Sequence, residues 1–175
     1  GKKIKKGDII NIDITLEKNG FIADSSKMYT IGDINPAAKK LVDVTYQAMW
    51  KGIQQVKAGA ATGDIGHAIQ KHAEQFGFSV VREYCGHGIG REMHEEPQIL
   101  HYGRPHTGVI LKEGMTFTIE PMVNQGTNKT KTKKDGWTVI TKDKKLSAQW
   151  EHTILVTKDG FEVLTLREEE TVPSL

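Results

Sequence analysis

The chain has 175 residues, with 24 Lys and Arg against 22 Asp and Glu, so its net charge is only +2. This length predicts one domain that buries about 70% of the surface of its unfolded chain. The small net charge gives no argument for a specific nucleic-acid partner, and no apolar run approaches the roughly 20 residues that cross a bilayer. The single cysteine, Cys85, excludes an internal disulfide and suits the reducing cytoplasm.

Two strands joined by a tight turn are predicted near the N-terminus. Residues 10–17 alternate between apolar and polar side chains, which is the period of a half-buried strand. Asn19 and Gly20 follow, a strong signal for a two-residue hairpin turn. A second strand is then expected over roughly residues 21–31.

This turn fixes the register of the hairpin and with it the positions of two acids. Asp13 is expected opposite Ser26, and Asp24 opposite Thr15, so the two aspartates become diagonal neighbours on one sheet face, about 7–8 Å apart. Two carboxylates at this spacing can reach a shared cation. The alternative is a pair of solvated strand aspartates, and the hairpin alone favours that alternative.

Two helices should follow the hairpin. Asn35 and Pro36 are an N-cap and a first helical residue. Thr62 or Asp64 could cap the second helix, which Gly77 ends. In the first of these helices, apolar residues are predicted to share one face. They are Ala38, Leu41, Val42, Ala48, Met49, Ile53 and Val56.

Later segments return to strand patterns. They lie near residues 78–82, 115–119, 137–141, 150–156 and 161–166. Two adjacent helices among such strands predict the α+β class, with the helices packed on a mainly antiparallel sheet.

Three further side chains could share chemistry with the aspartates. Glu120 and Glu151 lie in strand-like segments, where acids are uncommon and are seldom buried without a partner. A structural salt bridge is the alternative for each. His87 lies between Gly86 and Gly88, which permit a close backbone approach. By itself, His87 could equally be a hydrogen-bonded core histidine.

Taken together, Asp13, Asp24, His87, Glu120 and Glu151 predict a two-metal centre. Oxygen-rich ligation with one imidazole suits Mn²⁺, Fe²⁺, Co²⁺ or Zn²⁺. Four crowded carboxylates repel one another, and two divalent ions neutralise them whereas one leaves a charge of −2. Two such ions lower the pKa of a shared water to near neutral, which creates a nucleophile for amide hydrolysis.

The segment from Tyr84 to Tyr102, YCGHGIGREMHEEPQILHY, closely resembles the signature of type I methionine aminopeptidases. Residues 11–13, 24–28, 118–122 and 151–153 resemble the metal-binding stretches of the same family, in order and spacing. The resemblance covers about residues 3–167. The short connection from His87 to His94 favours type I over type II.

The resemblance implies the pita-bread fold, a curved antiparallel sheet with helices outside and a metal pair on its concave face. We expect a catalytic domain over residues 1–167 and, from the sequence pattern, a flexible C-terminal tail over residues 168–175. The family usually carries further N-terminal residues that form the other half of the fold. We therefore expect the N-terminal half to be absent here, with an exposed apolar face and an unpaired sheet edge.

The resemblance also implies the metal-binding roles. Asp13 would bind metal, Asp24 and Glu151 would bridge both ions, and His87 and Glu120 would bind one of them.

Catalytic and substrate-binding roles follow from the same resemblance. Glu120 would shuttle a proton as general acid and base, and His94 would contact the substrate and stabilise the oxyanion. Trp137 would line the pocket for the methionine side chain. Met93 replaces the aromatic residue usual before His94, which predicts a looser pocket wall.

The implied activity is removal of the initiator methionine from nascent proteins whose second residue is small, by a cytoplasmic enzyme that is a monomer when complete. A basic rim near Trp137 suggests contact with the anionic ribosome surface. This basic rim consists of Lys129, Lys131, Lys133, Lys134, Lys142, Lys144 and Lys145.

Two other functions are compatible with the pattern. One is a pita-bread module that binds peptides or proteins without catalysis, which the complete ligand set disfavours. The other is a prolidase-like metallopeptidase, which the 84–102 segment disfavours. The remaining histidines are predicted to be structural rather than metal ligands: His67, His72, His101, His106 and His152.

Overall fold

The N-terminal hairpin forms with the predicted register. In a computed structural model that describes residues 3–173, β1 (Ile9–Lys18) pairs antiparallel with β2 (Phe21–Thr30). Asp13 lies opposite Ser26 and Thr15 lies opposite Asp24, as expected. The turn residues Asn19 and Gly20 have φ angles of 55° and 76°, the positive values that a tight hairpin turn requires.

The first helix, α1 (Pro36–Ile53), begins where the sequence predicts. The Asn35 side chain accepts a hydrogen bond from the Ala37 N–H at 2.8 Å, which satisfies one of the free donors of the first turn. All seven residues of the predicted apolar face are buried, although Val56 lies beyond the end of the helix.

The second helix, α2 (Thr62–Gln75), has its N-cap at Ala61, so Thr62 and Asp64 both lie inside the first turn. Asp64 still satisfies the helix start, because its carboxylate accepts a hydrogen bond from the Ala61 N–H at 2.8 Å. Gly77, with a φ of 79°, follows the end of the helix as predicted.

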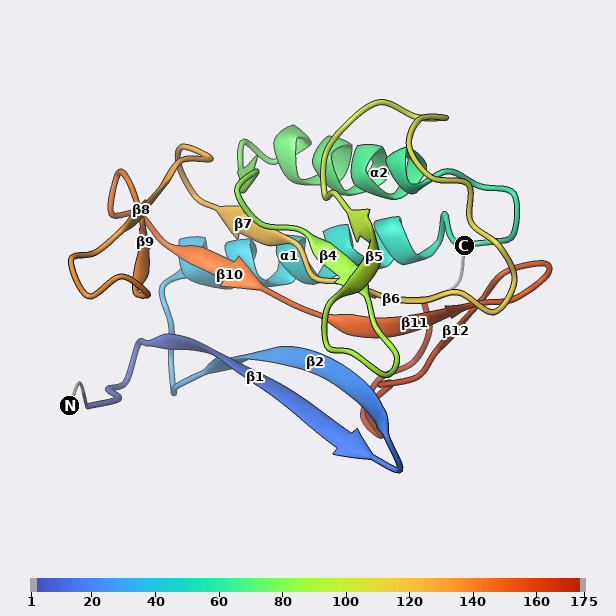
Figure 1. The fold of residues 1–175 in the computed structure, drawn as a ribbon. Coiled ribbons are helices and arrows are strands. Elements are labelled where there is room, and N and C mark those ends of the chain that lie inside the picture. The colour runs from blue at the N-terminus through green and yellow to red at the C-terminus, as the bar shows by residue number, and fades with distance from the viewer. Residues whose placement is uncertain (1–2, 174–175) are drawn as a thin grey trace.

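All paired strands are antiparallel within the described residues 3–173. A five-stranded sheet has the order β12 (Phe161–Val163), β11 (His152–Val156), β6 (Thr116–Ile119), β4 (Gly86–Gly88) and β5 (Glu95–Ile99). A three-stranded sheet has the order β10 (Ser147–Gln149), β7 (Met122–Asn124) and β3 (Ser79–Val80). The strands β8 (Thr130–Thr132) and β9 (Val139–Thr141) form a separate hairpin at one end of the molecule (Figure 1).

The two larger sheets share one interrupted ribbon. The register of β6 with β11 continues unchanged into β7 with β10, so Glu120 lies opposite Glu151 and Pro121 opposite Trp150. The ladder is interrupted at these four residues, and Pro121 has no N–H to donate there. Both predicted glutamate ligands therefore lie at the interruption.

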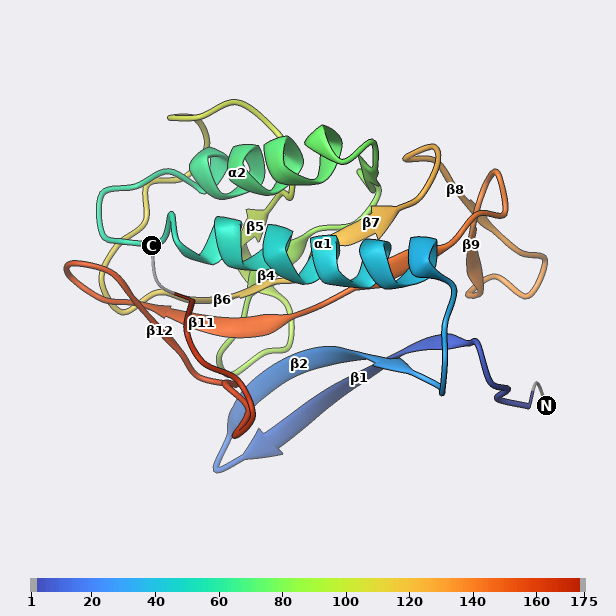
Figure 2. The same cartoon turned by 180° about the vertical axis from the view of Figure 1, so that it is seen from behind.

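The helices cover one side of the strands, and the β1–β2 hairpin lies on the other (Figures 1 and 2). The core fills the space between helices and strands, and its fully buried members include Leu41, Met49, Ile53, Ile65, Ile69, Phe117, Ile119 and Ile154. Within the part of the chain that the structure describes, neither helix is long and apolar enough to cross a membrane.

The β1–β2 hairpin carries exposed apolar side chains: Ile12, Ile14 and Leu16 are 47%, 53% and 66% accessible.

Near the C-terminus, Glu169 pairs with Lys27 of β2. The boundary between domain and tail at residue 168 stays a prediction, and residues 1–2 and 174–175 lie outside the described residues.

A glycine in the middle of α2 yields the first prediction. A Cβ at Gly66 would lie 2.5 Å from the carbonyl oxygens of Leu100 and Tyr102, and backbone cannot move aside cheaply. Gly66→Ala should therefore destabilise the fold by roughly 1–3 kcal/mol, although the same change inside an unobstructed helix stabilises it by up to about 1 kcal/mol. Urea denaturation measures the difference. Lys71→Ala, on the exposed side of α2, is the control and should change little.

Candidate metal centre

An acid-lined cavity of about 610 Å³ opens between the hairpin and the larger sheets. Asp13 of β1 and Asp24 of β2 line one side. His87 of β4 and Glu120, which directly follows β6, also line it. Four of the five predicted ligands, far apart in the sequence, thus meet at one cavity.

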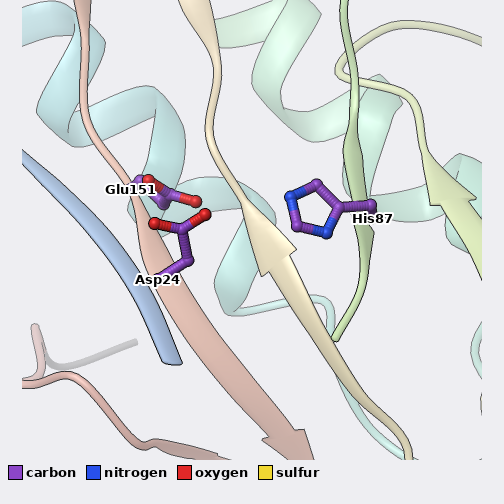
Figure 3. A group of neighbouring side chains, drawn as sticks. All are labelled: Asp24, His87 and Glu151. Carbon is purple, nitrogen blue, oxygen red and sulfur yellow. The ribbon is translucent and has the colours of Figure 1, made fainter. Parts of the chain in front are cut away.

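The fifth predicted ligand, Glu151, lies beneath the cavity and is 1% exposed. Asp24, His87 and Glu151 each offer a ligand atom, and these three atoms lie within 4.8 Å of one another. Figure 3 shows the Asp24 and Glu151 carboxylates side by side, with the His87 ring directed toward them from β4, on the far side of β6. The arrangement can hold a metal ion between one imidazole and two carboxylates.

The Glu151 carboxylate gives the sharpest test of whether a cation fits. Both of its oxygens are buried, and neither has a hydrogen-bond partner among the described residues. Burial of an ionised carboxylate without a partner is strongly unfavourable, and such groups are normally paired or coordinated to metal. The residues present therefore fit a divalent cation at this position.

The backbone N–H groups of Glu120 and Glu151 point away from the shared ribbon, and both find acceptors outside it. The Glu120 N–H donates to His101 Nε2 at 3.1 Å, and the Glu151 N–H donates to the Ser26 carbonyl at 3.2 Å. His101 is fully buried, and burial lowers its pKa to about 3, which keeps the ring neutral and able to accept. Both glutamate backbones are thus fixed although neither belongs to a ladder.

Crowding of acids makes the metal-free centre hold protons. Burial, together with the charges of Glu120, Asp24 and Asp13, raises the pKa of Glu151 to about 10. Burial raises the pKa of Glu120 to about 7, with Asp24 and Asp13 contributing and a hydrogen bond from Thr118 opposing. Burial and the charge of Asp24 also raise the pKa of Asp13. Protons or cations must reduce the negative charge of this cluster.

The imidazole of His87 is oriented for ligation. Its Nδ1 lies 3.0 Å from the Gly88 carbonyl, and its Nε2 lies 3.4 Å from Glu120 Oε1. A proton on Nδ1 donated to that carbonyl leaves the lone pair of Nε2 directed at the acids. Burial lowers the pKa of His87, which favours the neutral form that binds metal.

Several polar side chains around the ligands were not singled out from the sequence. Thr118 Oγ1 donates to Glu120 Oε1 at 2.7 Å, and Gln149 Nε2 donates to Glu120 Oε2 at 3.3 Å. Thr15 Oγ1 donates to Asp24 Oδ1 at 2.9 Å. Strand alternation could have placed Thr118 beside Glu120, because side chains two residues apart point to the same face.

The predicted substrate-contacting residues occupy different positions. His94 and Met93 line the cavity, and the His94 ring lies 4.4 Å from the His87 ring between centroids. Trp137 lies in the turn between β8 and β9, is 79% exposed, and is not among the residues that line the cavity.

An α+β fold with carboxylates and an imidazole converging on one cavity defines a metalloprotein centre suited to hydrolysis. The sequence matches the profile of metallopeptidase family M24 over residues 1–158, and the chain belongs to this family.

Methionine aminopeptidases are among its similar relatives. The enzyme of Escherichia coli K12 is 55% identical over 174 residues, which is 99% of this chain and 66% of that protein. The crystal structure of the Rickettsia prowazekii enzyme has a TM-score of 0.93 at 58% identity, covering 94% of this chain and 67% of that one. A prolidase from Pyrococcus furiosus is more distant, with a TM-score of 0.74 at 25% identity.

The predicted fold class is confirmed by this structural similarity. The chain spans about two thirds of the length of the methionine aminopeptidases that it matches.

The raised pKa values predict how the metal-free chain responds to pH. The folded state retains protons that an unfolded glutamate, with a pKa near 4.5, releases. The contribution of these two glutamates to stability should therefore be largest below pH 4.5 and fall as the pH rises, through about 7 for Glu120 and toward 10 for Glu151. The slope is at most about 1.4 kcal/mol per pH unit for each retained proton.

Urea denaturation in chelator at pH 5.5 and pH 8 measures this loss. Glu151→Gln should flatten the pH dependence, because an amide has no proton to lose. Glu17→Gln, an exposed position on β1, is the matched control and should keep the full dependence. If the free energy of unfolding of Glu151→Gln still fell with pH as steeply as that of the unchanged chain, Glu151 would not be the group that retains a proton.

Proposed function

We propose that this chain carries the metal centre of an aminopeptidase that removes the N-terminal methionine of nascent proteins when the second residue is small. The observation that carries this proposal is 55–58% identity to methionine aminopeptidases over nearly the whole chain. The unpartnered Glu151 carboxylate and the converging acids support it independently, because they suit a cation.

Asp13, Asp24, His87, Glu120 and Glu151 would hold two divalent ions, drawn from Mn²⁺, Fe²⁺, Co²⁺ and Zn²⁺. Charge supports the number, since four carboxylates match the charge of two such ions. When bound, the ions supply Lewis-acid polarisation of the scissile carbonyl and lower the pKa of a nucleophilic water.

The side chains around this centre would do the rest of the chemistry. Glu120, at the wall of the cavity, would accept a proton and deliver it to the leaving nitrogen. Its carboxylate is held by Thr118 and Gln149, so the proton is received at a fixed position. His94, at the cavity wall, would donate a hydrogen bond to the oxyanion.

The same cavity offers apolar surface for a methionine side chain. Tyr84, Cys85, Met93 and Met122 line it beside the acids. We propose Met93 as a substrate contact on this basis. The role of Trp137 rests on the resemblance of its position in the sequence to the family.

Release of methionine from a Met-Ala-Ser peptide tests the proposal directly. The chain loaded with Mn²⁺ or Co²⁺ should release free methionine, and a chelator should abolish the release. Glu120→Gln should lower the rate by about 100-fold or more, because the proton shuttle is lost. Glu17→Gln is the matched control on an exposed strand position and should retain full activity.

The alternative functions give different results in the same assay. A non-catalytic binding module would bind the peptide without releasing methionine. A prolidase-like enzyme would prefer a peptide with proline in second place to Met-Ala-Ser. Either outcome would contradict the proposed activity.

A ribosome contact through the basic rim has support from its charge. Residues 129–145 contain seven lysines and two aspartates, a net charge of +5, against +2 for the whole chain. All seven lysines are exposed. Asp135 instead accepts hydrogen bonds within its own turn, and Asp143 accepts them from the Thr127 and Lys145 N–H groups. Such a surface attracts RNA phosphates, and nascent chains emerge beside them on the ribosome.

We also propose that the protein acts in the cytoplasm and that the complete protein is a monomer.

Changing Lys129, Lys131, Lys133 and Lys134 to glutamate should abolish co-sedimentation with ribosomes at low salt, because the surface charge is reversed. The matched control changes four exposed lysines on the helical side, Lys39, Lys40, Lys51 and Lys57, and should leave sedimentation intact. Equal sedimentation of both variants would remove the basic rim from the proposal.

A further inference from the structure

The Arg167 guanidinium lies behind the metal centre, between β2 and the junction of β10 with β11. Its Nη2 donates to Ser25 Oγ at 2.8 Å and to the Ser26 carbonyl at 2.7 Å. The same nitrogen lies 3.5 Å from the Glu151 carbonyl, which also accepts from Ser25 Oγ at 3.1 Å. Ser25 and Ser26 directly follow the predicted ligand Asp24, and Glu151 is itself a predicted ligand.

These contacts matter because β2 and β11 are not paired as strands in any sheet of the described residues. The two predicted bridging ligands come from these separate units, since Asp24 lies in β2 and Glu151 directly precedes β11. Apart from the Arg167 and Ser25 contacts, the units are joined here by the Glu151 N–H to Ser26 carbonyl bond and by Thr153 Oγ1, which contacts the backbone of Asp24. Side-chain contacts and one backbone hydrogen bond, not a ladder, therefore set the spacing between the bridging ligands.

Glu170 fixes the guanidinium in turn. Arg167 Nη1 donates to Glu170 Oε1 at 2.9 Å and to Oε2 at 3.1 Å, and the Arg167 backbone N–H donates to Oε2 at 3.2 Å. His152 Nε2 lies 3.3 Å from the same oxygen. The Glu170 side chain is only 7% exposed and that of Arg167 17%, so this pair is far better shielded from water than an ordinary surface ion pair.

We propose that Arg167, held by Glu170, is a positioning residue that fixes the backbones of Asp24 and Glu151 relative to each other and so sets the geometry for metal binding. This role rests on the proposed metal centre. Residues 167–170 would then support the metal site through Arg167 and Glu170. Arginine is suited to it because one planar group donates in fixed directions to several acceptors at once.

Calorimetric titration of Mn²⁺ into the metal-free chain tests the proposal, with Met-Ala-Ser hydrolysis measured on the same samples. Glu170→Gln and Arg167→Met should each weaken Mn²⁺ binding by about tenfold or more, as loss of outer-shell support does at other metal sites. Glu169→Gln is the matched control, because Glu169 is the adjacent acid, is exposed and pairs with Lys27. It should change the affinity by less than about twofold.

Urea denaturation in chelator separates positioning from simple stability. Reduced folding stability with unchanged Mn²⁺ affinity would overturn the proposal, and so would equal affinity in Glu170→Gln and Glu169→Gln. If Arg167→Met does not fold, Glu170→Gln decides. Metal binding without hydrolysis by the unchanged chain would contradict the proposed function alone, and affinity would still decide the role of Arg167. No Mn²⁺ binding by the unchanged chain would overturn both.

Discussion

Glu120 and Glu151 face each other where the antiparallel ribbon of the two larger sheets loses its ladder, and the other ligands are arranged around this interruption. Pro121 cannot donate a ladder hydrogen bond, and the N–H groups of Glu120 and Glu151 point away from the ribbon. His101 and Ser26 accept these two N–H groups. Both glutamate N–H groups are therefore satisfied at the place where the two carboxylates come together.

Such an arrangement has an electrostatic cost that shapes the chemistry. Four carboxylates share the centre, and burial raises the pKa of two of them to about 7 and about 10. Without cations the fold must hold protons, and the Glu151 oxygens have no protein donor within residues 3–173. Divalent ions relieve the same repulsion without protonation. The carboxylates of the metal-free centre repel one another, and that of Glu151 lacks hydrogen-bond donors among the described residues, so they are well suited to bind divalent ions.

Much of the fold could be predicted because its signals are local. Asn19 and Gly20 fixed the register of the hairpin, and with it the relation of Asp13 to Asp24. Asn35 and Pro36 fixed the start of α1. The segment from Tyr84 to Tyr102 identified the family, which the comparisons confirmed. Each of these features depends on residues that are neighbours in the chain or across one tight turn.

The sequence by itself determined the class of fold, the family and the set of residue types able to bind metal. Only the tertiary structure decided which groups support that set. His101 had been expected to be structural, and its contact with the Glu120 N–H appears only after folding, as does the contact of Arg167 with Ser26. The reason is physical: turn and cap geometry follow from adjacent residues, whereas partners separated by up to 142 positions meet only when packing has placed their strands.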